Sequence, residues 1–171
     1  PPSSTTRPNH SACSALLAPL SDPRSLTLAH RCAVAESDLR EADRLLEGLS
    51  RHSVTPDMET LLRHAWLHGD ASSPGQGLAL LADTTPPESL AEAHRSLRVW
   101  LSVEDGALKS ALAVESEGPI APHHRAHLAR ALFEAGSPVT ARTQMRQACR
   151  GLTDADQRQC HKALSLMTED P

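Results

Sequence analysis

The chain has 171 residues, of which 39 % are hydrophobic and only 2 % aromatic, so its core must be built largely from small and aliphatic side chains. Few β-branched residues argue against a sheet, whereas abundant Ala, Leu, Arg and Glu favour helices. A net charge of −4 gives no general attraction to nucleic acid. No apolar run approaches the roughly 20 residues that span a bilayer. The composition therefore predicts an all-α protein without a transmembrane segment.

The N-terminal residues 1–9 are rich in Pro, Ser and Thr and lack periodicity, so they are predicted to form a flexible tether. Residues 10–171 are predicted to form one helical domain. Because the chain starts at Pro1 without Met, we expect that processing or trimming has removed something upstream. A removed export signal, with or without a lipid anchor, is the expectation, and a cytoplasmic protein is the alternative.

Pairs of Ser or Thr with Pro mark the predicted helix starts, because the hydroxyl can cap free amides and proline fits the first turn. Gly69, Gly136 and Gly151 are predicted to end helices in a left-handed conformation. These marks predict nine to ten helices, the first being the weakest because Ala18-Pro19 interrupts it. They are expected near 10–19, 24–36, 38–50, 56–68, 74–83, 87–102, 105–115, 122–135, 138–150 and 154–168.

Four of these helices begin at or beside a proline, and the spacing between them is regular. The prolines are Pro23, Pro56, Pro87 and Pro122, which gives steps of 33, 31 and 35 residues. A period of about 33 residues with two helices indicates an α-solenoid of antiparallel helix pairs. The expected repeats are 23–55, 56–86, 87–121 and 122–152, followed by a capping helix at 154–168.

The segment 122–155 resembles the tetratricopeptide repeat, in that paired apolar residues precede Gly136, Ala141 and Ala148 at that family's spacing. The stretch 61–69 aligns with 128–136, with arginine, aromatic residue and glycine in register. The other repeats are degenerate, and the family's final proline is missing after Ala148. The resemblance implies a right-handed superhelix that binds a partner protein. An irregular α-solenoid of similar period is the alternative.

The four cysteines fall into two pairs, each symmetric about a predicted turn. Residues equidistant from the turn of an antiparallel helix hairpin face each other, so Cys13 is expected to bond Cys32, and Cys149 to bond Cys160. Such bonds would staple the two ends of the stack and require an oxidising compartment, such as the periplasm or the extracellular space. Four unpaired thiols in a cytosolic protein are the alternative.

The tetratricopeptide resemblance implies a concave groove lined by the first helix of each pair. The repeat offset places arginines at equivalent positions on these helices, followed one turn later by aromatic residues. They are Arg31, Arg63, Arg95 and Arg130, with Trp66 and Phe133. Guanidinium groups pair with carboxylates, so the groove is expected to take an acidic or C-terminal segment of another protein. Solvated arginines and core-packed aromatics are the alternative.

Histidines suggest a second, weaker hypothesis, a metal or small-ligand site. His123 and His127 lie at i, i+4 spacing, but no carboxylate or cysteine accompanies them and there is no His-Glu-x-x-His motif. Histidines recur on other first helices, at His64, His68 and His94, which we interpret as a solvated face or a codon bias. No catalytic or cofactor-binding motif is present, so an interaction scaffold of a bacterial-type cell envelope, rather than an enzyme, is predicted.

Overall fold

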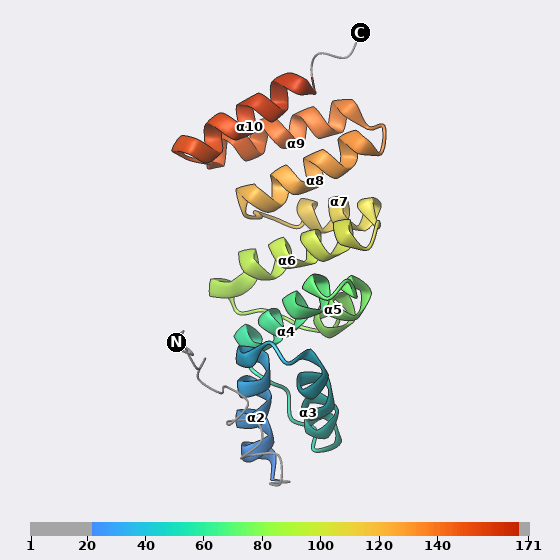
Figure 1. Ribbon diagram of the computed structural model, residues 1–171, viewed down its shortest axis with the longest axis vertical. Coiled ribbons are helices and arrows are strands. Elements are labelled where there is room, and N and C mark those ends of the chain that lie inside the picture. Colours follow the sequence, from blue (N-terminus) through green and yellow to red (C-terminus); the bar gives the residue numbers. More distant parts are fainter. Residues whose placement is uncertain (1–21, 168–171) are drawn as a thin grey trace, which may run out of the picture. The chain divides into compact units, whose positions relative to one another are not determined.

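The computed structural model describes residues 22–167, and this part of the chain is all-helical, without strands (Figure 1). The all-α prediction is therefore confirmed, and the helices predicted from residue 24 onward are found within a few residues of their expected ends. The predicted helix at 10–19 and the predicted tether at 1–9 lie outside the described residues. The elements are α2 (Pro23–Glu36), α3 (Leu39–Arg51), α4 (Met58–Asp70), α5 (Pro74–Leu81), the 3₁₀ turn η1 (Glu88–Leu90), α6 (Ala91–Glu104), α7 (Leu108–Ser116), α8 (Pro122–Glu134), α9 (Pro138–Gly151) and α10 (Asp154–Leu166).

The chain divides between Leu67 and His68 into two compact units. The first unit contains α2, α3 and most of α4, and α2 packs against α3. Small residues are completely buried in its core, which lets the helix axes approach closely. The buried cluster comprises Leu26, Ala29, Ala33, Val34, Ala42, Leu45, Leu49 and Leu67.

The second unit contains the end of α4 and the elements from α5 to α10. Consecutive helices lie side by side, α6 with α7, α8 with α9, and α9 with α10, and α6 also packs on α8 (Figure 1). Its core also combines small side chains with larger aliphatic ones. It comprises Val99, Ala111, Val114, Ile120, Leu128, Ala129, Leu132, Ala141, Met145, Ala148, Cys149, Cys160 and Met167.

Aspartates cap α2 and α4, and at α4 the capping residue is Asp57 rather than the predicted hydroxyl of Thr55. Asp22 Oδ1 accepts from the amides of Arg24 (3.1 Å) and Ser25 (3.0 Å), at the start of α2. Asp57 caps α4 by accepting from the amide of Thr60 at 3.0 Å. A carboxylate is the stronger acceptor and also interacts favourably with the positive end of the helix dipole.

The serines that precede Pro74 and Pro138 hold the predicted positions at helix starts but make no side-chain cap hydrogen bond. Ser73 instead donates its hydroxyl to the carbonyl of His68 at 3.0 Å, which closes the turn before α5. Proline at the first turn therefore marks these helix starts correctly. The expected capping by the neighbouring hydroxyl was wrong for both.

Only one of the three glycines predicted to stop helices has a left-handed backbone. Gly136 follows α8 with φ +76°. Gly69 lies inside α4, and Gly151 is the last residue of α9. A Cβ on Gly69 would stand 2.3 Å from the Trp100 ring, and one on Gly151 would stand 2.6 Å from Pro122 Cγ. These two glycines therefore serve close packing, which corrects the prediction.

Candidate partner-binding site

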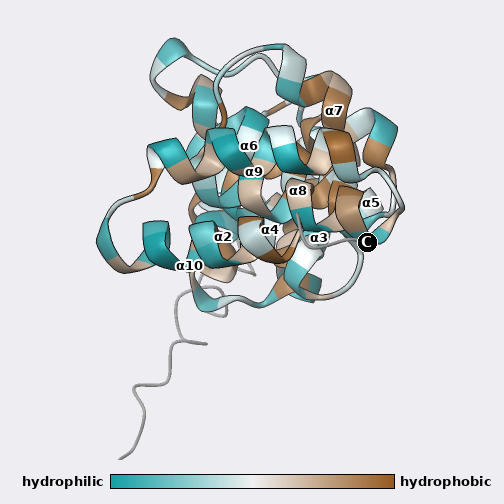
Figure 2. Cartoon of the chain, turned by 90° about the horizontal axis from the view of Figure 1, so that it is seen from above, coloured by the Kyte–Doolittle hydropathy of each residue, from teal (hydrophilic) through white to brown (hydrophobic). Residues whose placement is uncertain are grey.

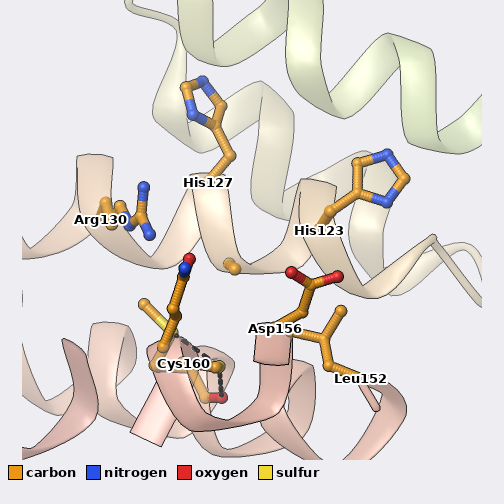
Figure 3. Close-up of a pocket in the computed structure, with 9 residues that line it drawn as sticks. His123, His127, Arg130, Leu152, Asp156 and Cys160 are labelled. Carbon is orange, nitrogen blue, oxygen red and sulfur yellow. Dashed lines mark hydrogen bonds between the residues drawn. The ribbon is translucent and has the colours of Figure 1, made fainter. Parts of the chain in front are cut away.

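The second unit contains a pocket of about 340 Å³ between α8 and α10 (Figure 3). One wall comes from α8, whose residues at i, i+4 and i+7 spacing share one face. The other wall comes from α10. Met145 on α9 and Leu152, which follows α9, complete the lining. The lining residues are His123, Ala126, His127 and Arg130 on α8, Met145 and Leu152, and Asp156, Gln159 and Cys160 on α10.

Opposite charges face this pocket from its two walls. Arg130 is exposed on α8 and makes no hydrogen bond or ion pair with the described residues. Asp156, also exposed and unpaired within the described part, projects from α10 toward α8 (Figure 3). The guanidinium therefore has its fork of N–H donors available for a carboxylate. A ligand with an acidic group at the Arg130 end matches this arrangement.

The histidines beside this pocket are held in different ways. His127 Nε2 lies 2.8 Å from Glu104 Oε1 on α6, which fixes its ring. His124 has a buried Nδ1 that finds no hydrogen-bond partner among residues 22–167, and burial, followed by repulsion from His123 and His127, lowers its pKa to about 4. Within the described residues, His123 and His127 are not joined by a third metal-ligating side chain. Structural and catalytic zinc sites use at least three protein ligands.

The first unit has a comparable pocket of about 320 Å³ between α2 and the start of α4. Two of the predicted groove residues, Arg31 and Arg63, line it. Arg31 Nε lies 3.5 Å from Asp57 Oδ2, and Arg63 Nη2 donates to the carbonyl of Ala35 at 3.3 Å. Burial opposes ionisation of Asp57, but hydrogen bonds from Thr60 and the Arg31 charge outweigh it, so its pKa is lowered. The remaining lining residues are Val34, Ala35, Glu59 and Thr60.

The other three predicted groove residues have different surroundings. Trp66 is 45 % exposed, an unusual exposure for so large an apolar side chain. Arg95 donates from Nε to the carbonyl of Pro119 at 3.1 Å and so ties α6 to the loop before α8. Phe133 is half-buried and packs against the core of the second unit. Arg95 and Phe133 thus have structural contacts of their own.

The first unit contains a buried polar chain that was not predicted from the sequence. His30 and His64 are fully buried, and His30 Nε2 lies 3.1 Å from His64 Nδ1. His64 Nε2 lies 3.0 Å from Asp43 Oδ1. Because the carboxylate can only accept, His64 carries its proton on Nε2 and accepts at Nδ1 from His30. Burial, with repulsion from His64, lowers the pKa of His30 to about 4.

Two further histidines on first helices are also buried, so the expected solvated face was wrong. His68 Nδ1 lies 3.2 Å from Ser73 Oγ, and His94 Nε2 lies 3.0 Å from Thr84 Oγ1. In α4 the buried His64 and His68 fall three and seven residues after Leu61, which is itself buried. This helical spacing with an apolar residue was the signal that could have placed them in the core.

The disulfide predicted between Cys149 and Cys160 is present and joins α9 to α10, with the Cα atoms 5.5 Å apart. Cys13 lies outside the described residues, so its bond to Cys32 stays a prediction. Among the described helices, none is long and apolar enough to cross a bilayer. No protein-family model, curated protein or solved structure matches the chain.

Proposed function

We propose that this chain is a protein-interaction scaffold of tetratricopeptide-like helix pairs that holds an acidic or C-terminal segment of a partner. One observation carries the proposal. Each unit has a pocket lined by first helices of the predicted repeats. In one unit these are α2 and α4, and in the other α8 lines the pocket together with the capping helix α10. Three of the four arginines predicted for such a surface, Arg31, Arg63 and Arg130, line these pockets.

The chemistry of these pockets supports a carboxylate ligand. Arg130 has no partner among the described residues, and a guanidinium can bind a carboxylate through two parallel hydrogen bonds. In the first unit, the exposed indole of Trp66 lies one turn after Arg63 on the same helix. Large rigid aromatic side chains contribute strongly to binding when a partner covers them.

The disulfide between Cys149 and Cys160 supports a place of action outside the cytoplasm, because structural disulfides persist in oxidising compartments. A periplasmic or otherwise extracytoplasmic scaffold, with a lipid anchor upstream of Pro1 as one form, fits this chemistry.

The proposal is tested with short fluorescent peptides in three matched forms: Glu-rich with a free carboxyl terminus, the same peptide amidated, and its Gln-for-Glu counterpart. The free acidic peptide should bind best, and Arg130→Glu should weaken its binding by about tenfold or more. Arg146→Glu is the matched control, because Arg146 is exposed on α9 and lines neither pocket. Equal binding of all three peptides, or an equal effect of the two variants, would contradict the proposal.

A further inference from the structure

We infer that the Cys149–Cys160 disulfide positions one wall of the α8–α10 pocket, and that its reduction weakens ligand binding there. The inference rests on the proposed function for the identity of the ligand. Cys160 itself lines the pocket, and Asp156 and Gln159, four residues and one residue before it, line the same wall from α10. The disulfide that holds Cys160 therefore also holds the α10 wall of the pocket in position.

Within the described part of the chain, few other apolar side chains hold α10. Cys160 is the one residue buried within this helix, and Met167, directly after it, is also buried. Ala163 and Leu164 are partly buried against the core, and most of the rest of α10 is exposed and hydrophilic (Figure 2). Apolar burial of this size stabilises a helix only weakly.

The start of α10 is also poorly anchored. Its N-cap residue Thr153 makes no side-chain hydrogen bond, and Asp154 has a left-handed backbone with φ +47°. One side-chain hydrogen bond joins this part of α10 to α9, from Gln157 Nε2 to the carbonyl of Cys149 at 3.3 Å. The covalent bond at Cys160 is therefore the main connection that keeps Asp156 facing α8.

The floor of the pocket reinforces this dependence. Met145 lines the pocket, and its Sδ lies 3.4 Å from Cys160 Sγ. By contrast, α8 packs against both α6 and α9, and Leu128 and Leu132 on α8 are buried in the core of the second unit. Release of α10 should therefore remove one wall of the pocket while the Arg130 wall keeps its fold.

The chemical step is a thiol–disulfide exchange with a dithiol reductant. Two electrons and two protons convert the Cys149–Cys160 bond into two thiols, while the dithiol is oxidised to its own disulfide. The free thiols no longer fix the distance between α9 and α10, and α10 separates from α9.

The experiment uses the Cys13→Ser/Cys32→Ser chain, in which Cys149 and Cys160 are the remaining cysteines. Affinity for the free-carboxyl Glu-rich peptide and amide hydrogen exchange are measured with and without dithiothreitol. We expect reduction to weaken binding by about tenfold or more and to accelerate exchange in 154–166 but not in 122–134. The otherwise wild-type chain with Cys149→Ala/Cys160→Ala should match the reduced state without any reductant.

Unchanged protection of 154–166 after reduction would overturn the inference, because the disulfide would then not position α10. Fast exchange of α10 with unchanged affinity would overturn it as well, because α10 would then not form a binding wall. Absence of peptide binding in the oxidised protein would instead contradict the proposed function. The exchange measurement would still test whether the disulfide holds α10.

Discussion

Gly69 sets how closely the last turn of α4 approaches α6, because a Cβ there would lie 2.3 Å from one ring carbon of Trp100 and 2.8 Å from Leu101 Cδ2. Gly69→Ala should therefore force the indole or the helix to move and lower the free energy of unfolding by about 1–3 kcal/mol. The melting temperature and urea denaturation measure this loss.

Gly48→Ala is the matched control for that substitution. Gly48 is also inside a helix, but a Cβ there would lie 3.8 Å from Leu26, an ordinary contact. Alanine favours the helix by about 1 kcal/mol over glycine, so this variant should be neutral or more stable. If both variants changed the melting temperature equally, the close approach of Trp100 would not be the reason for Gly69.

His30 makes the first unit sensitive to acid. Its pKa is lowered from 6.5 to about 4 in the folded state, so below pH 6.5 the unfolded chain binds a proton that the folded chain does not. Stability should be complete above pH 6.5 and fall by about 3 kcal/mol as the pH drops to 4. The pKa of His124 is also about 4, so the second unit should lose stability over the same range.

Denaturation at a series of pH values, followed with an amide-exchange probe for each unit, measures this dependence. His30→Gln keeps an amide donor for His64 and removes the titrating ring, so the first unit should show a flatter profile. His161→Gln, at an exposed position on α10, should leave the profile unchanged. A profile of the first unit that stays just as steep in His30→Gln would contradict the assignment to His30.

At the scale of helices, a polar network joins α7, α8 and α9. Arg125 on α8 pairs with Glu115 on α7 and donates to Gln144 (2.8 Å) and Gln147 (2.6 Å) on α9. The side chains of Arg125 and Glu115 are only 14 % and 17 % exposed. Arg125→Met leaves the carboxylate without its cation in a mostly buried place, so it should cost about 3 kcal/mol or more.

Urea denaturation of Arg125→Met, with Arg146→Met as the exposed control on α9, measures this cost. Adding Glu115→Met to Arg125→Met should restore much of the stability, because two apolar side chains need no charge compensation. A double variant less stable than Arg125→Met alone would show that Glu115 contributes independently of the ion pair.

The sequence predicted the helices well because their punctuation is local. Proline at the first turn of α5, α8 and α9 fixes the backbone whatever lies around it. The Cys149–Cys160 bond followed from symmetry about a single turn. The roles of Gly69 and Gly151 could not be predicted, because they depend on Trp100 and Pro122, which lie far away in the sequence.

The candidate site was predictable only in part, because contacts between residues far apart in the sequence are not visible in a local pattern. The repeat offset identified Arg31, Arg63 and Arg130, which line pockets. It could not distinguish them from Arg95, whose donor is directed to Pro119. The α10 wall, with Asp156 and Gln159, was missed because a capping helix has no equivalent residues in the repeats. The His30–His64–Asp43 chain needed three helices to be placed together.

At the scale of the whole molecule, the repeat period predicts that an arginine-lined surface recurs from one repeat to the next. The chain folds as two compact units rather than as one continuous stack of contacts. Each unit has its own hydrophobic core and its own arginine-lined pocket. The chain therefore has two separate candidate sites, one in each unit.

If these first-helix arginines hold an acidic partner segment, calorimetric titration of the chain with the free-carboxyl Glu-rich peptide should show binding that depends on them. We expect Arg63→Glu/Arg130→Glu to abolish binding while the melting temperature stays within a few degrees of wild type. Arg24→Glu/Arg146→Glu makes the same change in net charge at exposed positions outside both pockets, and should bind as wild type does. Wild-type affinity in the Arg63→Glu/Arg130→Glu chain, or equal loss in both double variants, would contradict the claim.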